Sequence, residues 1–326
     1  NSYTAQKNGG ANVNLHPRGP QVTKLLNSLS RESYQKSRTS FADRGVGKME
    51  FSDLSCIDLD NEGHGECKAV LAVLGQGKTN QLFKQQYGAC LRNKDVQICP
   101  VGSIAMYFFW RFEVDREGYP DFAESRNWHN CKVIRGCPTD AMQEFSYKSH
   151  YDAIADAFKK AGIVGKAKTH AGRSGSVRIA ELGGCDEDSL RRFGRWNAQA
   201  MEGCYLSQLA REPMRVLAGF GPKTRTYFIP RDTVQPSESL LSKVFPPVTR
   251  LLEEEANRGT PNIAAIGFLR LLLYLRKVLL QDAVQLQVHY PNHPLWRHEV
   301  FQSQEFLDFK QQLLSVTEHT ETPAEV

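Results

Sequence analysis

Five residues between positions 170 and 205 have the types and the spacing needed to bind and attack a phosphodiester. His170 and Arg173 form an H-x-x-R pair at the start of a helical stretch. Arg195 and Trp196 follow one short helix later, and Tyr205 comes about two and a half helical turns after them. A phosphodiester in transfer gathers negative charge on its non-bridging oxygens, which guanidinium groups bind through two hydrogen bonds at once. A tyrosine has a free pKa of about 10, so as a nucleophile it would need these cations beside it.

Basic residues gather around this motif, and we expect them to contact the phosphate backbone of nucleic acid. The whole chain has a net charge of only +5, so such a surface must come from local clustering. Each of Arg178, Arg191 and Arg192 taken alone could be an ordinary solvated charge on a helix, but the group favours phosphate binding. The predicted DNA-binding residues of this stretch are Lys166, Lys168, His170, Arg173, Arg178, Arg191, Arg192 and Arg195.

The order H-A-G-R, F-G-R-W and Y-L resembles the carboxy-terminal half of the tyrosine recombinase catalytic domain. It is most similar to the fungal branch of that family. This branch includes the Crypton-type transposon recombinases and the large centromere-DNA-binding subunit of the budding-yeast inner kinetochore complex. The segments YPNHP (290–294) and FQSQEFLDF (301–309) are similar to domain II of that subunit and foreign to ordinary recombinases. The two resemblances together cover most of the chain from about residue 48 onward.

The resemblance implies roles for individual residues if the chain is active. Tyr205 would form a 3′-phosphotyrosine, and Lys78, in a β-turn, would donate a proton to the leaving 5′ hydroxyl and also contact DNA. A solvated hairpin lysine is the alternative for Lys78. Arg44 is the candidate for the first catalytic arginine, with Arg38 second, although neither lies in the family's R-G-E context. The implied catalytic set is Tyr205, Arg173, His170, Arg195, Trp196, Lys78 and Arg44, with no metal and no cofactor.

Each of these residues also has a purely structural interpretation. His170 could be a hydrogen-bonded core histidine, Trp196 could serve packing alone, and Tyr205 could be half-buried with its hydroxyl in solvent. The eight cysteines fall singly without a C-x-x-C pair, which argues against zinc and indicates reduced thiols in the cytosol or nucleus. Because the chain starts without a methionine, we expect it to be part of a longer protein.

Hydrophobic periodicity predicts a mainly helical (α+β) fold with one small antiparallel sheet, like a recombinase catalytic domain, plus a carboxy-terminal helical extension. The strand-like runs are 67–74, 131–134 and 226–229. Helices are expected at 21–36, 44–59, 81–87, 101–112, 147–161, 174–182, 186–193, 197–209, 263–280 and 304–314.

We expect three parts along the chain. Residues 1–20 are a flexible arm or linker, 21–232 a recombinase-like DNA-binding domain, and 233–326 a helical extension that packs on it. The apolar run at 263–280 is interrupted by Arg270, Arg276 and Lys277 and is too short to be a typical membrane span.

Two functions of different class fit these observations. The first is a non-catalytic, largely sequence-tolerant platform for duplex DNA in a centromere or kinetochore complex. Its expected partners are double-stranded DNA and other subunits of that complex; we expect a homodimer in the full-length protein, a nuclear location and no membrane. The second is an active Crypton-type recombinase or transposase. We favour the first, because the first arginine departs from the family pattern and the tail resembles the kinetochore subunit. A protein-interaction domain on an old recombinase fold is a third possibility.

Overall fold

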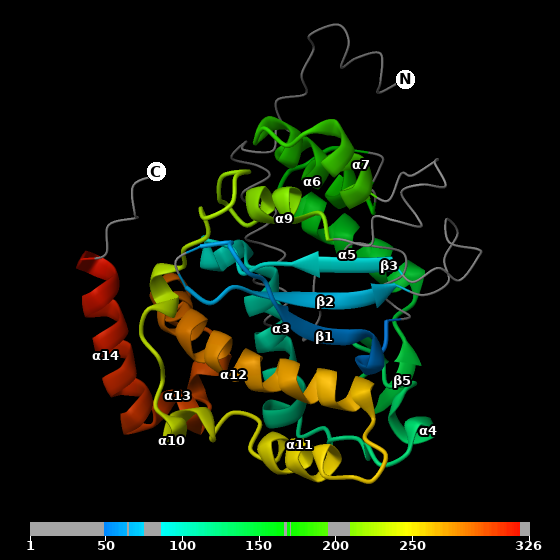
Figure 1. Ribbon diagram of the computed structural model, residues 1–326, viewed down its shortest axis with the longest axis vertical. Coiled ribbons are helices and arrows are strands. Elements are labelled where there is room, and N and C mark those ends of the chain that lie inside the picture. Colours follow the sequence, from blue (N-terminus) through cyan, green and yellow to red (C-terminus); the bar gives the residue numbers. More distant parts are fainter. Residues whose placement is uncertain are drawn as a thin grey trace, which may run out of the picture.

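The computed structural model describes residues 49–319 apart from 64, 75–85, 166, 167, 170 and 195–208. It leaves out the side chains of residues 74, 86, 173, 318 and 319. Helices dominate the described chain, and they surround a small antiparallel sheet (Figure 1). The expected mainly helical fold with one small sheet and a helical carboxy-terminal region is thereby confirmed. The helix expected at 21–36 lies outside the described residues, as does the helix expected at 197–209 except for its last residue, Leu209.

The sheet has three strands in the order β1 (Leu54–Asp58), β2 (Lys68–Leu74) and β3 (Gln86–Cys90). The strand expected at 67–74 is confirmed as β2. Successive residues of a strand point to opposite faces, so Val70 of β2 reaches the main core and Ala69 a smaller apolar cluster on the other face. A separate two-stranded ladder, β4 (Arg135–Cys137) with β5 (Asp140–Glu144), follows the short helix α4 (Ser125–Trp128).

Two expected helices are wrong where the described residues cover them. The stretch expected as a helix at 44–59 contains only a 3₁₀ turn, η3 (Phe51–Asp53), before it becomes β1. The helix expected at 81–87 ends in conflict with β3, which starts at Gln86. Both stretches pair with β2, and this pairing sends Leu54 and Cys56 to the core. A tertiary partner therefore overrides the local preference of the sequence.

The carboxy-terminal region supplies the longest helix of the described chain, α12 (Ile263–His289). The helix extends nine residues beyond the expected run at 263–280. It packs against β1 on one side and α3 (Pro100–Phe109) on the other, so one core holds residues from both sides of position 232. Whether 21–232 and 233–326 are separate units stays a prediction. The remaining elements here are η6 (Pro230–Asp232), α10 (Glu238–Leu241), α11 (Val248–Ala256), η7 (Pro294–Arg297), α13 (Glu299–Gln302) and α14 (Gln304–His319).

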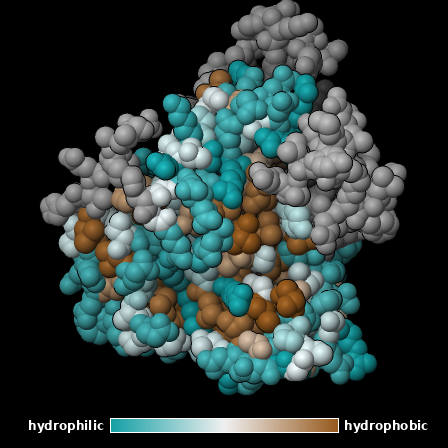
Figure 2. Space-filling model, in the orientation of Figure 1, coloured by the Kyte–Doolittle hydropathy of each residue, from teal (hydrophilic) through white to brown (hydrophobic). Residues whose placement is uncertain are grey.

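Four helices form a group at the opposite end of the molecule from α11 (Figure 1). The surface over α6 and α7 is mainly hydrophilic, whereas apolar side chains gather lower on the same face, over the sheet and α12 (Figure 2). The expected helices at 147–161, 174–182 and 186–193 are all present in this group. Its members are α5 (Tyr147–Lys160), α6 (Ala171–Leu182), α7 (Glu187–Gly194) and α9 (Arg211–Leu217).

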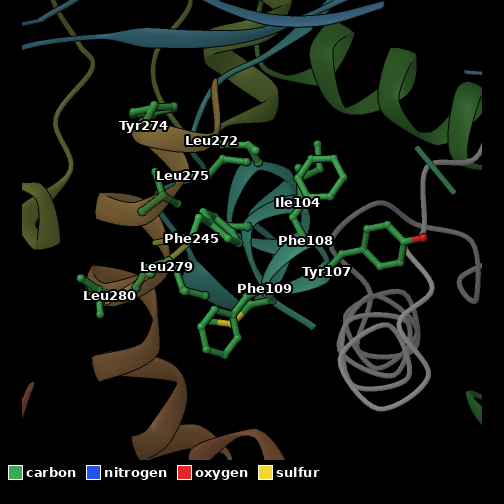
Figure 3. Packing of buried hydrophobic residues seen from close by; sticks show 14 of the residues in the cluster. Ile104, Tyr107, Phe108, Phe109, Phe245, Leu272, Tyr274, Leu275, Leu279 and Leu280 are labelled. Carbon is green, nitrogen blue, oxygen red and sulfur yellow. The ribbon is translucent and has the colours of Figure 1, made fainter. Parts of the chain in front are cut away.

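The main core lies where α3 crosses α12. Helix α3 begins with Pro100 in its first turn and continues into a π-helical turn, η5 (Trp110–Val114). Figure 3 shows Phe245 between the side chains of the two helices, with Phe108 and Phe109 on α3 and Leu275 on α12. These side chains are fully buried. Removing one buried Phe typically costs about 3–5 kcal/mol, so the helix crossing contributes strongly to the stability of the fold.

A buried charged cluster links α12 to the loops beside the sheet. Asp282 of α12 is fully buried, and its Oδ1 accepts hydrogen bonds from Arg92 (2.6 Å) and Arg231 (2.6 Å). Burial alone would raise the pKa of Asp282, but the two guanidinium groups outweigh it and the pKa is lowered. The side chain also sits close to Gly102 of α3, where a Cβ would come within 2.2 Å of Asp282 Oδ2. Glycine at 102 therefore allows α3 and α12 to approach.

Candidate nucleic-acid interface

Most of the predicted catalytic residues lie outside the described part of the chain. These are Arg44, Lys78, His170, Arg195, Trp196 and Tyr205, together with the predicted DNA-binding residue Lys166. Arg173 lies in the first turn of α6, and its side chain is not described. Four predicted DNA-binding residues are described in full, namely Lys168, Arg178, Arg191 and Arg192.

The segment that leads into the H-x-x-R motif is fixed by apolar packing against α5. Phe158, Ala161 and Ile163 form a small cluster that Ala171, the first residue of α6, also contacts. The chain turns after α5 at Gly162, whose φ of +67° favours glycine. Thr169 is buried, and Lys168 places its ammonium 4.5 Å from the ring centroid of Phe158. Ala171, the second residue of the motif, therefore begins α6 against this small apolar cluster.

A tight turn joins α6 to α7 and brings both against α9. Ala180 of α6, Leu190 of α7 and Val216 of α9 share one buried cluster. At Gly183 a Cβ would lie 2.2 Å from Cγ1 of Val216, so the position has no room for a side chain. Gly184 has a φ of +89°, which again favours glycine. Helices α6, α7 and α9 thus form one packed unit.

The described arginines of α6 and α7 lie on this unit and bond to neighbours on their own helices. Arg178 pairs with Glu181 at 2.7 Å, and Arg191 pairs with Glu187 at 2.7 Å. Both pairs are exposed, so each contributes little to stability and leaves the arginine able to exchange its partner for a phosphate. Arg192 donates to the hydroxyl of Ser189 at 3.1 Å. That these residues bind DNA stays a prediction.

A carboxylate pair connects α7 to α9 beside the arginines. Asp186 accepts the backbone N–H of Ser189 (2.8 Å) at the start of α7. This bond, together with a hydrogen bond to Glu212, lowers the pKa of Asp186 to about 2. Burial and the same contact raise the pKa of Glu212. The low pKa keeps Asp186 ionised at the amino end of α7, where the helix dipole favours a negative charge.

An ion-pair network surrounds α9, and none of the sequence motifs described above predicts it. Glu62 is buried in the turn after β1 and accepts hydrogen bonds from Arg215 (2.8 Å) and Arg211 (3.3 Å). Arg215 also donates through Nε to the carbonyl of Pro222 (3.0 Å). The spacing of Arg211 and Arg215 by four residues, which places both on one helix face, is the signal that could have revealed it. The network ties α9 to the sheet and to the loop that follows.

The described residues contain neither a metal-binding cluster nor a helix able to cross a membrane. Within them, no group of three or more His, Cys, Asp and Glu side chains is placed to hold a metal ion. None of the described helices is long and apolar enough to cross a membrane.

The chain matches the model of a known protein family. The model of the family described as centromere DNA-binding protein complex CBF3 subunit, domain 2, matches residues 25–307. The chain belongs to this family. The match to the CBF3-subunit domain includes the α6–α7 unit, the sheet and all of α12, and it ends within α14. The expected similarity to domain II of the kinetochore subunit is confirmed. No curated protein matches the chain.

Proposed function

We propose that this chain binds duplex DNA, without cutting it, as one domain of a centromere-complex subunit. The observation that carries the proposal is the family match across residues 25–307, since the family is named for a centromere DNA-binding complex. The arginines of α6 and α7 support it, because Arg178 and Arg191 lie on helices that pack together and Lys168 precedes the first of these helices.

The proposed binding mode rests on phosphate contacts. Arg173 lies in the first turn of α6, where the helix dipole and free backbone N–H groups favour an anion. Arg178, Arg191 and Arg192 would exchange their local partners for phosphate oxygens, and Lys78, Lys166 and Arg195 would add further cations. Contacts of this kind carry little sequence information, so binding is tolerant of base sequence and falls steeply with salt.

The biological setting follows from the same family. We infer that the chain works in the nucleus at the centromere, with other subunits of the kinetochore complex as partners, and that the full-length protein is a homodimer. We also infer that the fold is a degenerate relative of the tyrosine recombinase catalytic domain. The order of the H-x-x-R, G-R-W and tyrosine motifs supports this kinship, and the unusual context of Arg44 and Arg38 supports a loss of chemistry.

The binding proposal is tested by removing two cations at the start of α6. Arg173→Ala combined with Lys168→Ala should weaken binding to a short labelled duplex and flatten the dependence of affinity on salt. The slope of log K against log salt should fall by roughly 1.8, because each lost phosphate contact is worth about 0.9. Arg270→Ala with Arg297→Ala removes the same charge on α12 and η7 and serves as the matched control. An unaltered chain that fails to bind duplex at low salt would overturn the proposal.

An active recombinase is the second candidate, and the spacing of His170, Arg173 and Tyr205 is the observation that favours it. A nicked suicide duplex traps a covalent phosphotyrosine if Tyr205 attacks, because the released fragment cannot rejoin. We expect no covalent adduct on a denaturing gel. An adduct that forms with the unaltered chain and disappears with Tyr205→Phe would replace the first function by the second.

A further inference from the structure

Three exposed cations border α9, away from the residues that the sequence motifs single out. They are Lys94, Lys223 and Arg225, and the described part of the chain offers none of them an ion-pair partner. Asp95 follows Lys94 directly, but its Oδ1 accepts the backbone N–H of Gln97 (2.8 Å). These three cations thus differ from Arg178 and Arg191, which pair with glutamates on their own helices.

Hydrogen bonds fix the loop that carries Lys223 and Arg225. Arg215 bridges the buried carboxylate of Glu62 and the carbonyl of Pro222. The hydroxyl of Thr226 donates to the carbonyls of Gly221 (3.1 Å) and Lys223 (3.0 Å). The loop therefore presents its cations in a fixed arrangement, which lowers the entropy lost when they bind a ligand.

The end of this loop is fastened to the turn that follows β1. Arg225 has a φ of +68°, uncommon for a residue with a side chain, and its N–H donates to the carbonyl of Asn61 (3.2 Å). Tyr227 then forms a parallel bridge with Gly63, where a Cβ would lie only 1.8 Å from the carbonyl oxygen of Tyr227. This close approach requires glycine at position 63. It also fixes Arg225 beside the turn that follows β1.

Lys94 is fixed beside the start of the same loop. Its N–H donates to the carbonyl of Ala218 (2.8 Å), and its carbonyl accepts from the buried Arg231 (3.0 Å). Gly219 lies against it, because a Cβ there would come within 3.3 Å of the Cβ of Lys94. Lys223 comes four positions after Gly219, so the chain between them spans at most about 14 Å. All three cations therefore fall within reach of a few neighbouring phosphates on one strand.

This basic edge joins the α6–α7 unit. Cγ of Pro222 lies 3.9 Å from the position that a Cβ on Gly184, in the α6–α7 turn, would occupy. Helix α9 packs on both α6 and α7. We propose that Lys94, Lys223 and Arg225 form a second phosphate-contact surface, which extends the duplex-binding surface of α6 and α7 past α9. This inference rests on the proposed function and adds residues to it.

The test removes charge from the loop while keeping its backbone conformation. Lys223→Gln combined with Arg225→Asn leaves an asparagine at the positive φ, which asparagine tolerates better than most residues. The rise from 50 to 200 mM salt should then cost about tenfold less affinity for a short labelled duplex than in the unaltered chain, as two lost phosphate contacts require. Adding Lys94→Gln should flatten the salt dependence further.

Two further variants separate the possible outcomes. The charge-preserving pair Lys223→Arg with Arg225→Lys should bind as the unaltered chain does. The control Arg270→Gln with Arg297→Asn removes equal charge elsewhere and should change the slope little. If the unaltered chain binds duplex and the loop variant matches this control, the second surface is refuted while the proposed function stands. If the unaltered chain does not bind duplex at all, both are refuted.

Discussion

At the scale of single residues, the strongest constraint is the charge cluster around Asp282. Arg92 and Arg231 both donate to this carboxylate, and Gln281 next to it accepts a hydrogen bond from Arg92 (2.7 Å). Asp282 and Arg92 are fully buried, so neither charge can find compensation in water. A buried ion pair is weak evidence for net stability, but removal of one partner leaves an uncompensated charge. This asymmetry makes the cluster a sensitive point of the fold.

Asp282→Asn should destabilise the chain by about 3–5 kcal/mol, because two buried guanidinium groups lose their counter-charge. The melting temperature should fall by roughly 6–20 °C for a chain of this size. The pKa of Asp282 is lowered in the folded chain, so its contribution is present above pH about 4 and is lost as the pH falls through the lowered value. The variant should therefore lose less stability than the unaltered chain on acidification, as thermal melts between neutral and acid pH would record. Asp308→Asn, at an exposed position of α14, should melt within about 0.5 kcal/mol of the unaltered chain; an equally small effect at Asp282 would contradict the argument.

At the scale of elements, the sequence predicted what is local and missed what is distant. Helix α5 was predicted almost to the residue, since its apolar spacing and the glycine at 162 are both local signals. The sequence predicts a helix where strand β1 lies, because only pairing with β2 and packing against α12 define this strand. Arg92 and Asp282 form a hydrogen bond although they lie 190 residues apart in the sequence. No pattern in the sequence around either residue predicts this bond.

The candidate site divides in the same way. The cations of α6 and α7 were visible because they lie in one stretch of sequence. Lys94 and Lys223 were not visible in the sequence. Only the folded chain places Gly219, four positions before Lys223, against Lys94. Unpaired surface cations on well-fixed loops can be recognised only once the fold has shown which acids lie near them.

Gly183→Ala tests whether the packing of α6 on α9 positions the cationic surface. The new methyl group would meet the side chain of Val216, so we expect a loss of about 1–3 kcal/mol. Hydrogen exchange should speed up in α6, α7 and α9 before it does in α3 and α12, and duplex affinity should fall with it. Gly175→Ala, in the middle of α6 with no atom near the new Cβ, should instead stabilise the helix by up to about 1 kcal/mol. Equal behaviour of the two variants would mean that the contact with Val216 does not matter.

At the scale of the whole molecule, α12 places part of the expected helical extension (233–326) in one core with part of the expected DNA-binding domain (21–232). Four of its leucines, Leu269, Leu272, Leu275 and Leu279, are fully buried in the same core as α3 and β1. Burying one leucine contributes about 1.5–3 kcal/mol, so these four alone supply roughly 6–12 kcal/mol. The net stability of a protein is only about 5–15 kcal/mol. The fold that carries the proposed DNA-binding surface therefore depends on a helix that lies far from that surface in the sequence.

A chain that stops at residue 236 should for this reason fail to fold. We expect no cooperative thermal transition, binding of a hydrophobic dye to the exposed face of α3, and loss of duplex affinity. A chain that stops at residue 319 keeps all of α12 and α14 and should melt and bind as the full chain does. The opposite result, a shortened chain that melts cooperatively and still binds duplex, would mean that residues 21–232 are an independent DNA-binding domain. In that case the helices after residue 232 would be free to serve partner subunits alone, whereas a shared core makes these helices part of the fold that carries the proposed DNA surface.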